Sequence, residues 1–128
     1  MNKPSPESTR PPALNPRQHN RRFPRFRAQL NMTVTVLGPD GSFDVHGLCN
    51  EISEGGIGCI IGRELSVGEL VTLALRFSPA DPPTSLRAIV RWRDRLRHGL
   101  EFFMPSAEQS AALRAFCTRL SSEPDARV

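Results

Sequence analysis

The amino-acid sequence predicts a mainly β protein, a small six-stranded antiparallel barrel with one α-helix at its C-terminal end. Three observations lead to this fold class. Apolar and polar residues alternate in six short stretches, turn-forming residues separate these stretches, and helical periodicity occurs only near the end of the chain. The absence of strand–helix–strand alternation argues against a parallel α/β fold.

The first three expected strands come early in the chain. Residues 28–36 alternate between apolar and polar side chains, which is typical of a strand with one buried face. After a short turn, a second strand covers residues 43–52, and its apolar phase slips at Gly47, which predicts a bulge or a bend there. A glycine-rich turn at residues 53–56 leads into a third strand at 57–61.

Three more strands and a helix complete the expected fold. Residues 71–77 and 86–92 alternate in the same way, and residues 98–103 form the sixth strand. Ser106 and Gln109 have the spacing of a capping box, which marks the start of a helix. The apolar stripe of that helix consists of Ala112, Leu113, Phe116 and Leu120. We expect this stripe to close one end of the barrel or to pack on its outside.

Charge divides the chain into a basic N-terminal segment and a nearly neutral remainder. The net charge is +4, but residues 1–27 carry +6 and six of the twelve prolines, whereas residues 28–128 carry −2. Residues 1–19 have little to bury and are expected to form a disordered, basic, proline-rich arm. The expected folded domain is 20–120, and 121–128 reads as a polar tail.

The apolar runs and the cysteines indicate where in the cell the protein is expected. The longest apolar runs fall far short of a transmembrane helix, and the N-terminus has no apolar signal-peptide region. Three cysteines cannot form a complete disulfide framework, and Cys49, Cys59 and Cys117 lie in apolar surroundings. We therefore expect buried free thiols in a cytoplasmic protein that does not insert into a membrane.

Catalytic and metal-binding chemistry find little support. No cysteine or histidine pair has a zinc-ligand spacing, and no two carboxylates stand out as general acid and base. Cys49 and His46 are a conceivable nucleophile and base, but on a regular strand they face opposite sides, unless a bulge at Gly47 changes this. We expect a surface histidine at His46, and neither a metal, a cofactor nor an enzymatic activity.

Two segments are suited to an anion. Four arginines occur within seven residues just before the first strand, namely Arg21, Arg22, Arg25 and Arg27. Guanidinium groups pair in bidentate fashion with phosphate oxygens and with the O6/N7 edge of guanine. Gly55, Gly56 and Gly58 can bring backbone N–H groups against phosphate, although such a turn alone is more typical of a hairpin. Together these segments suit a small anionic guanine nucleotide.

This combination resembles the PilZ domain family, six-stranded barrels known for binding cyclic di-GMP in bacterial second-messenger signalling. The family signature has an Arg-x-x-x-Arg segment before the first strand, which Arg21 and Arg25 match here. Its second part is an Asp/Asn-x-Ser-x-x-Gly motif between the second and third strands, in which Ser53 and Gly56 match. Residues 97–102 also resemble the last strand of the family.

One position departs from the family pattern, because Glu51 stands where the family has Asp or Asn. Glutamate keeps the acceptor oxygens but moves them outward by one methylene. Asn50, one residue earlier, would point to the opposite face of a regular strand. Three outcomes stay open: Glu51 adapts, a bulge brings Asn50 round, or binding is weakened.

The resemblance implies a non-enzymatic cyclic di-GMP receptor or adaptor over about residues 20–120. Its arginine arm would order on the nucleotide, and the protein would signal to an unidentified protein partner. The implied ligand-binding residues are Arg21, Arg22, Arg25, Glu51, Ser53 and Gly56. The arginines would contact phosphates and guanine, the glutamate a guanine N–H edge, the serine phosphate or base, and the glycine would allow close approach.

Two other functions compete with this one. A degenerate PilZ-like module would bind a protein but no nucleotide, which Glu51 favours and the intact motif residues oppose. A nonspecific nucleic-acid binder would use the basic arm. The nearly neutral remainder and the lack of aromatics interleaved with lysine argue against it, so no nucleic acid polymer is expected as a partner.

Overall fold

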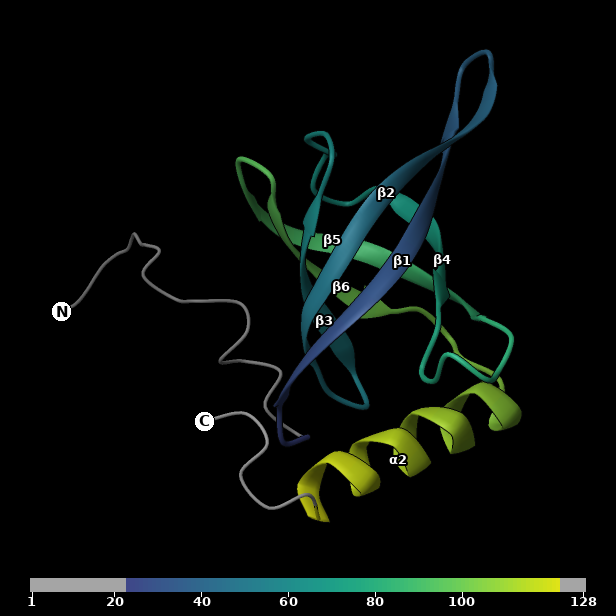
Figure 1. Cartoon of the computed structure of the whole chain (residues 1–128). Helices are drawn as coiled ribbons and strands as arrows, with labels where there is room; N and C mark the ends of the chain where they lie inside the picture. Colours follow the sequence, from purple (N-terminus) through teal and green to yellow (C-terminus); the bar gives the residue numbers. More distant parts are fainter. Residues whose placement is uncertain (1–22, 123–128) are drawn as a thin grey trace, which may run out of the picture.

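The computed structural model describes residues 23–122 and confirms the expected fold class, a closed antiparallel barrel followed by one helix. The elements are β1 (Phe26–Gly38), β2 (Gly41–Ile52), β3 (Gly56–Ile61), β4 (Leu70–Leu75), β5 (Thr84–Asp94), β6 (Arg97–Phe102) and α2 (Ala107–Ser122). Around the barrel the strands follow the order β1-β2-β3-β6-β5-β4, and the pairing of β1 with β4 closes the sheet (Figure 1). β1 and β5 extend further in both directions than their alternation predicted.

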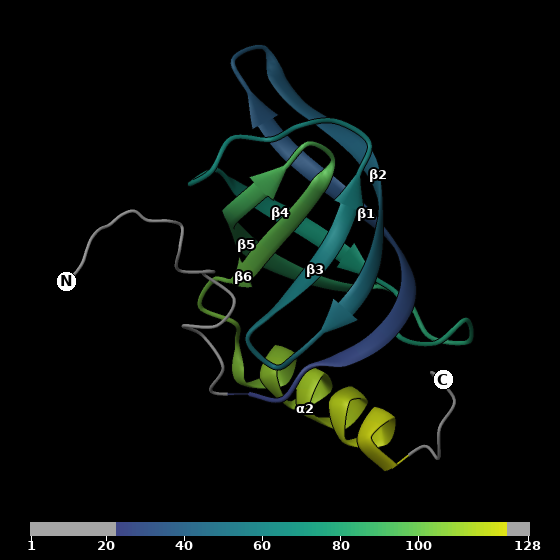
Figure 2. The ribbon, with the colours of Figure 1, turned by 90° about the vertical axis from the view of Figure 1, so that its left-hand side faces the viewer.

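The two ends of the barrel are built differently. At one end the β1–β2 hairpin projects beyond the other strands, and its turn depends on Gly41, whose φ of 114° favours glycine (Figure 1). At the opposite end α2 lies across the barrel, below the β2–β3 turn (Figures 1 and 2). Within residues 23–122, no helix is both long and apolar enough to cross a membrane.

The helix begins at the expected capping box and closes this end of the barrel. The Ser106 hydroxyl accepts the Gln109 N–H at 3.0 Å, and the Gln109 side chain accepts the Ser106 N–H at 2.7 Å. The buried helix residues are Leu113, Phe116, Cys117 and Leu120. Phe116 stacks on Phe77, with ring centroids 4.7 Å apart. Of the two expected placements, the structure confirms the one in which the stripe closes an end.

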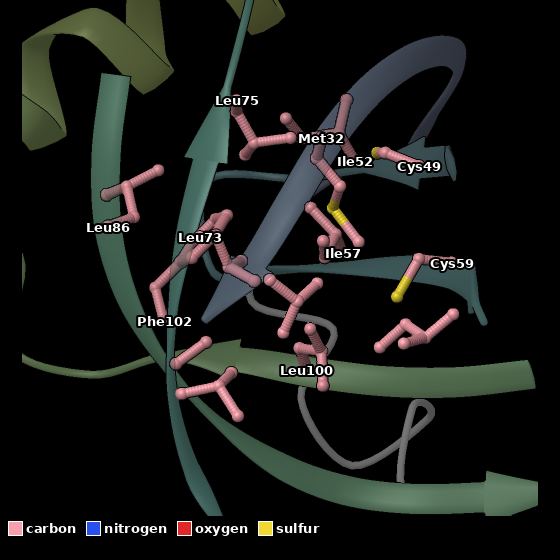
Figure 3. Close-up of a cluster of buried hydrophobic side chains, with 14 of the residues drawn as sticks. Met32, Cys49, Ile52, Ile57, Cys59, Leu73, Leu75, Leu86, Leu100 and Phe102 are labelled. Atoms are coloured by element: carbon pink, nitrogen blue, oxygen red, sulfur yellow. The ribbon is translucent and has the colours of Figure 1, made fainter. Parts of the chain in front are cut away.

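The barrel interior is one apolar core to which every strand contributes. Figure 3 shows how inward side chains such as Met32, Leu73, Leu86 and Phe102 converge there. Burying an aliphatic side chain of this size contributes about 1.5–3 kcal/mol. The apolar residues of the alternating pattern therefore direct the strands to form a barrel, and their burial provides much of its stability.

The cysteines are buried and free, as expected. Burial raises the pKa of Cys49 to about 12 and that of Cys117 to about 11, and it also raises the pKa of Cys59. The thiols are thus protonated near neutral pH and poorly nucleophilic. Exposed His46 and buried Cys49 lie on opposite sides of β2, as the regular strand predicted.

The side chain of His98 is fully buried, whereas the sequence indicated only that this residue lies on a strand. It shares the inward face of β6 with Leu100 and Phe102. Its Nε2 accepts the Leu65 N–H at 3.1 Å, and Nδ1 lies 2.7 Å from the Leu96 carbonyl. A neutral ring with its proton on Nδ1 satisfies both partners, which makes burial tolerable. Burial lowers the pKa of His98 and favours this neutral form.

The position of the bulge on β2 differs from the expected one. Gly47, where the bulge was expected, pairs regularly with Met32 and Ile61, and the register instead shifts between Cys49 and Glu51. Gly47 occupies an inward position whose space Met32 fills, since a Cβ there would lie 2.8 Å from the Met32 Cε. Gly47 therefore interrupts the apolar pattern only because it has no side chain, and the strand itself is regular there.

Candidate functional site

One pocket lies beside the β2–β3 turn and across the face formed by β2, β3, β6 and β5. Its space amounts to about 730 Å³, part of it open to solvent. The lining residues are Phe23, Arg25, Glu51, Ile52, Ser53, Gly55, Gly56, Ile57, Gly58, Arg91, Trp92, Gly99, Leu100 and Glu101. We call these four strands the pocket face.

The floor of the pocket is a row of four residues across the pocket face. Glu51 pairs with Gly58, Gly58 with Gly99, and Gly99 with Trp92. The Trp92 indole lies so close over Gly99 that a Cβ there would overlap it. A Cβ on Gly58 would come within 3.2 Å of the Glu51 carboxylate. Gly99 thus makes room for the Trp92 indole and Gly58 for the Glu51 side chain, and these two side chains cover the floor.

Bulges lie at both edges of this floor. The register shifts between Cys49 and Glu51 on β2, and between Val90 and Trp92 on β5. The Cys49 thiol donates to the Glu51 carbonyl across the first bulge, at 3.4 Å. Because a bulge re-aims the side chains beside it, these two bulges direct Glu51 and Trp92 toward the pocket.

The glycine-rich turn closes one end of the pocket. The Ser53 hydroxyl accepts the Gly55 N–H at 3.0 Å and the Gly56 N–H at 3.2 Å, so it fixes the turn. A Cβ on Gly56 would overlap the Leu100 carbonyl, so only glycine fits there without a shift. Phe23 packs over Gly55, whose Cβ would lie 3.2 Å from its ring. Both motif residues of the turn therefore have a structural role.

Two arginine–glutamate pairs line the walls. Arg25 Nη1 lies 3.9 Å from a Glu51 carboxylate oxygen, and these side chains are 18% and 31% exposed. On the other wall, Arg91 Nε donates to the Glu101 carboxylate at 2.5 Å. The formal charges of the described lining residues cancel. Residues 23–122 contain no group of three or more side chains suited to holding a metal ion.

The structure brings together the described residues of the sequence-predicted site. Arg25, Glu51, Ser53 and Gly56 come from the start of the described chain, from β2 and from the turn, and all line the pocket. Arg21 and Arg22 lie outside the described residues. Asn50 is exposed and outside the pocket lining, but the bulge brings its Oδ1 to within 3.7 Å of the position of a Cβ on Gly58, next to the Glu51 side chain that lines the pocket.

The sequence motifs do not include several residues of the pocket, above all Phe23, Arg91, Trp92 and Glu101. Regular alternation along residues 86–92 would point Trp92 into the apolar core, but the bulge at Arg91 shifts the phase. One signal was available in the sequence, because Gly58 and Gly99 remove side chains from two strands that pair with each other.

Comparisons with known proteins concern the family and the fold of the chain. A model of the PilZ domain family matches residues 19–119. No curated protein matches the chain. The Bacillus subtilis inhibitor of motility MotI/DgrA is 23% identical, with a TM-score of 0.63 over 81% of this chain and 53% of that one. This chain thus spans about half the length of MotI/DgrA.

Two further solved structures have the same fold over most of their length. The PilZ domain of YcgR from Escherichia coli, with c-di-GMP, is 14% identical, with a TM-score of 0.66 over 80% of this chain and 92% of that one. The PilZ domain of CeSA from a cellulose-synthesizing bacterium is 19% identical, with a TM-score of 0.60 over 77% and 98%. At these identities the likeness shows the fold.

Proposed function

The chain belongs to the PilZ domain family, and we propose that it is a receptor for cyclic di-GMP that acts through protein contacts rather than as an enzyme. One observation carries this proposal: the described motif residues Arg25, Glu51, Ser53 and Gly56 line a single pocket. The similar PilZ domain of YcgR was solved with c-di-GMP. The buried free thiols favour the cytoplasm as the place where it acts.

Phosphate recognition requires arginines beyond those that are described. Cyclic di-GMP carries two negative charges, whereas the described pocket residues carry no net charge. Arg21 and Arg22 directly precede Phe23, which lines the pocket. We propose that both arginines supply the missing positive charge together with Arg25. A charge-assisted hydrogen bond of this kind contributes about 1.5–3 kcal/mol.

We propose that residues at the floor of the pocket recognise the guanine base. The Glu51 carboxylate accepts hydrogen bonds, which suits the N–H edge of guanine. Ser53 has a further donor to offer. Its hydroxyl donates a long hydrogen bond of 3.4 Å to the Gly56 carbonyl. A phosphate oxygen can replace this carbonyl as the acceptor.

Signalling follows from ordering the arm on the nucleotide. We propose that the segment with Arg21 and Arg22 folds over the bound ligand and completes a surface for a protein partner. A link to the helix already exists, because Arg114 of α2 lies 3.7 Å from Glu54 in the β2–β3 turn. The turn and α2 together are thus positioned to report the ligand.

Calorimetric titration with cyclic di-GMP tests the proposal. The wild type is expected to bind, and the variant Arg21→Ala/Arg25→Ala to lose binding. Arg87→Ala/Arg97→Ala is a charge-matched control, because both residues are exposed and lie outside the pocket lining. Equal binding by the first variant and the control would overturn the site assignment.

One observation favours a second function, a protein-interaction module that binds no nucleotide. Arg25 already pairs with Glu51, so a ligand must compete with this contact. Absence of heat with the wild type, at tens of micromolar protein, would favour this module over the receptor. Tight binding of duplex DNA that weakens steeply with salt would instead support a nucleic-acid binder.

A further inference from the structure

We propose that Arg91, held by Glu101, is an additional nucleotide-binding residue, which contacts phosphate or guanine from the β5 wall of the pocket. The inference rests on the proposed function and extends it, because the PilZ motifs supply arginines only from the segment before β1. It gives the ligand a second arginine contact, across the glycine floor from Arg25.

The bulge on β5 is the first observation. On a regular strand, consecutive side chains point to opposite faces, so two neighbours cannot both face one site. Arg91 and Trp92 nevertheless both line the pocket, because the register of β5 against β6 shifts between Val90 and Trp92. Bulges are frequent beside active sites, where they re-aim a side chain.

The pairing of Arg91 is the second observation. Glu101 accepts from Nε, so the outer fork of the guanidinium, with both Nη nitrogens, is not used by this contact. Within residues 23–122, neither Nη nitrogen of Arg91 makes a hydrogen bond. A guanidinium held by its Nε is oriented in advance and presents a planar fork suited to phosphate or to the O6/N7 edge of guanine.

The position across the floor is the third observation. Arg25 pairs with Glu51 at the β2 edge of the floor, and Arg91 pairs with Glu101 at the β5 edge. Gly58 and Gly99 lie between these edges. Cyclic di-GMP is itself two-fold, with two phosphates and two guanines. One arginine at each edge matches a ligand with two such halves.

Arg93 offers a matched control on the same strand. It pairs with Glu64 at 2.6 Å, and its side chain is 35% exposed, against 47% for Arg91. Arg93 does not line the pocket. Exposed ion pairs contribute little to stability, so alanine at either position is expected to leave the fold intact.

The experiment compares cyclic di-GMP binding by the wild type, Arg91→Ala, Arg91→Lys and Arg93→Ala in calorimetry at two salt concentrations. Arg91→Ala is expected to weaken binding about 10-fold or more, as loss of a charge-assisted hydrogen bond implies. Its affinity should also depend less on salt, because one ionic contact is gone. The affinity of Arg91→Lys should lie between those of the wild type and Arg91→Ala, and Arg93→Ala should bind like the wild type.

The outcomes separate this inference from the proposed function. If the wild type binds and Arg91→Ala matches Arg93→Ala in affinity and in salt dependence, the role of Arg91 is refuted while the receptor function stands. If the wild type does not bind, both proposals fail. A thermal melt of each variant confirms that any loss of affinity belongs to folded protein.

Discussion

Two walls of the same barrel differ in structure, because one is tightly packed and the other lines the pocket. We call the pairing of β1 with β4, between residues 32–36 and 71–75, the closing seam. Its register is unbroken, and inward residues such as Val34 and Leu73 are fully buried. The pocket face has two register shifts and a floor of glycines. The seam gains stability from burial, whereas the glycines of the pocket face make room for the Trp92 and Glu51 side chains that line the site.

A substitution should act differently in the closing seam and on the pocket face. Truncation in the seam removes packing atoms and is expected to change stability alone. A change on the pocket face alters the shape or the charge of the site and is expected to change binding. Variants that affect stability and binding differently therefore test this division.

The largest effect is expected for Leu73→Ala in the seam. Loss of a fully buried leucine leaves a cavity, and the free energy of unfolding should fall by about 2–5 kcal/mol. The dissociation constant for cyclic di-GMP, measured on folded protein, should stay the same. Denaturant unfolding and calorimetry give the two numbers. Leu37→Ala, at the exposed hairpin tip, serves as the control that changes neither.

Gly56→Ala should have the next largest effect. The added Cβ overlaps the Leu100 carbonyl, and since backbone must move, the expected loss of stability is about 1–3 kcal/mol. Binding should weaken as well, because the turn shifts. Gly58→Ala is the matched control, since its Cβ meets mainly the flexible Glu51 side chain. Equal destabilisation by the two variants would contradict the close approach at Gly56.

His98 predicts a pH dependence of stability. Burial lowers its pKa in the folded state, so the unfolded chain takes up a proton first as the pH falls below about 6.5. Stability should therefore decrease toward acid, by at most about 1.4 kcal/mol per pH unit from this residue. Unfolding measured between pH 7 and pH 5 should show a smaller slope in His98→Gln than in the wild type. Identical slopes would contradict this role of His98.

The smallest effect is expected for Glu51→Asp on the pocket face. The shorter carboxylate keeps its acceptor oxygens and moves away from Arg25, with which Glu51 pairs at 3.9 Å. Binding of cyclic di-GMP should be equal or tighter, and stability nearly unchanged because the pair is partly exposed. Calorimetry decides the point, and clearly weaker binding would show that the longer side chain is needed.

Much of the fold follows from the sequence because each rule acts locally. Alternation gave all six strands, and the pair Ser106 and Gln109 marked the start of the helix. The missed features depend on tertiary context. The bulge at Asn50 cannot be located without its partner strand, and burial of His98 depends on the Leu65 and Leu96 backbone groups that satisfy its ring.

The site was predictable where it lies in short motifs. Arg25, Glu51, Ser53 and Gly56 came from two such segments, and the fold places them at one pocket. Arg91 and Trp92 carry no motif, because a bulge on β5 brings them to the site. Sequence patterns encode contacts along a strand, whereas this wall of the pocket is made by pairing between strands.

The most direct test of a cyclic di-GMP site on the pocket face is a nuclear magnetic resonance titration of the ¹⁵N-labelled protein. The chain has a single tryptophan, so its indole N–H gives one resonance. The account predicts that this signal and the Gly56, Gly58 and Gly99 amides shift with cyclic di-GMP, while the Leu73 amide in the seam does not. Unchanged spectra at saturating nucleotide, or shifts centred on the closing seam, would contradict it.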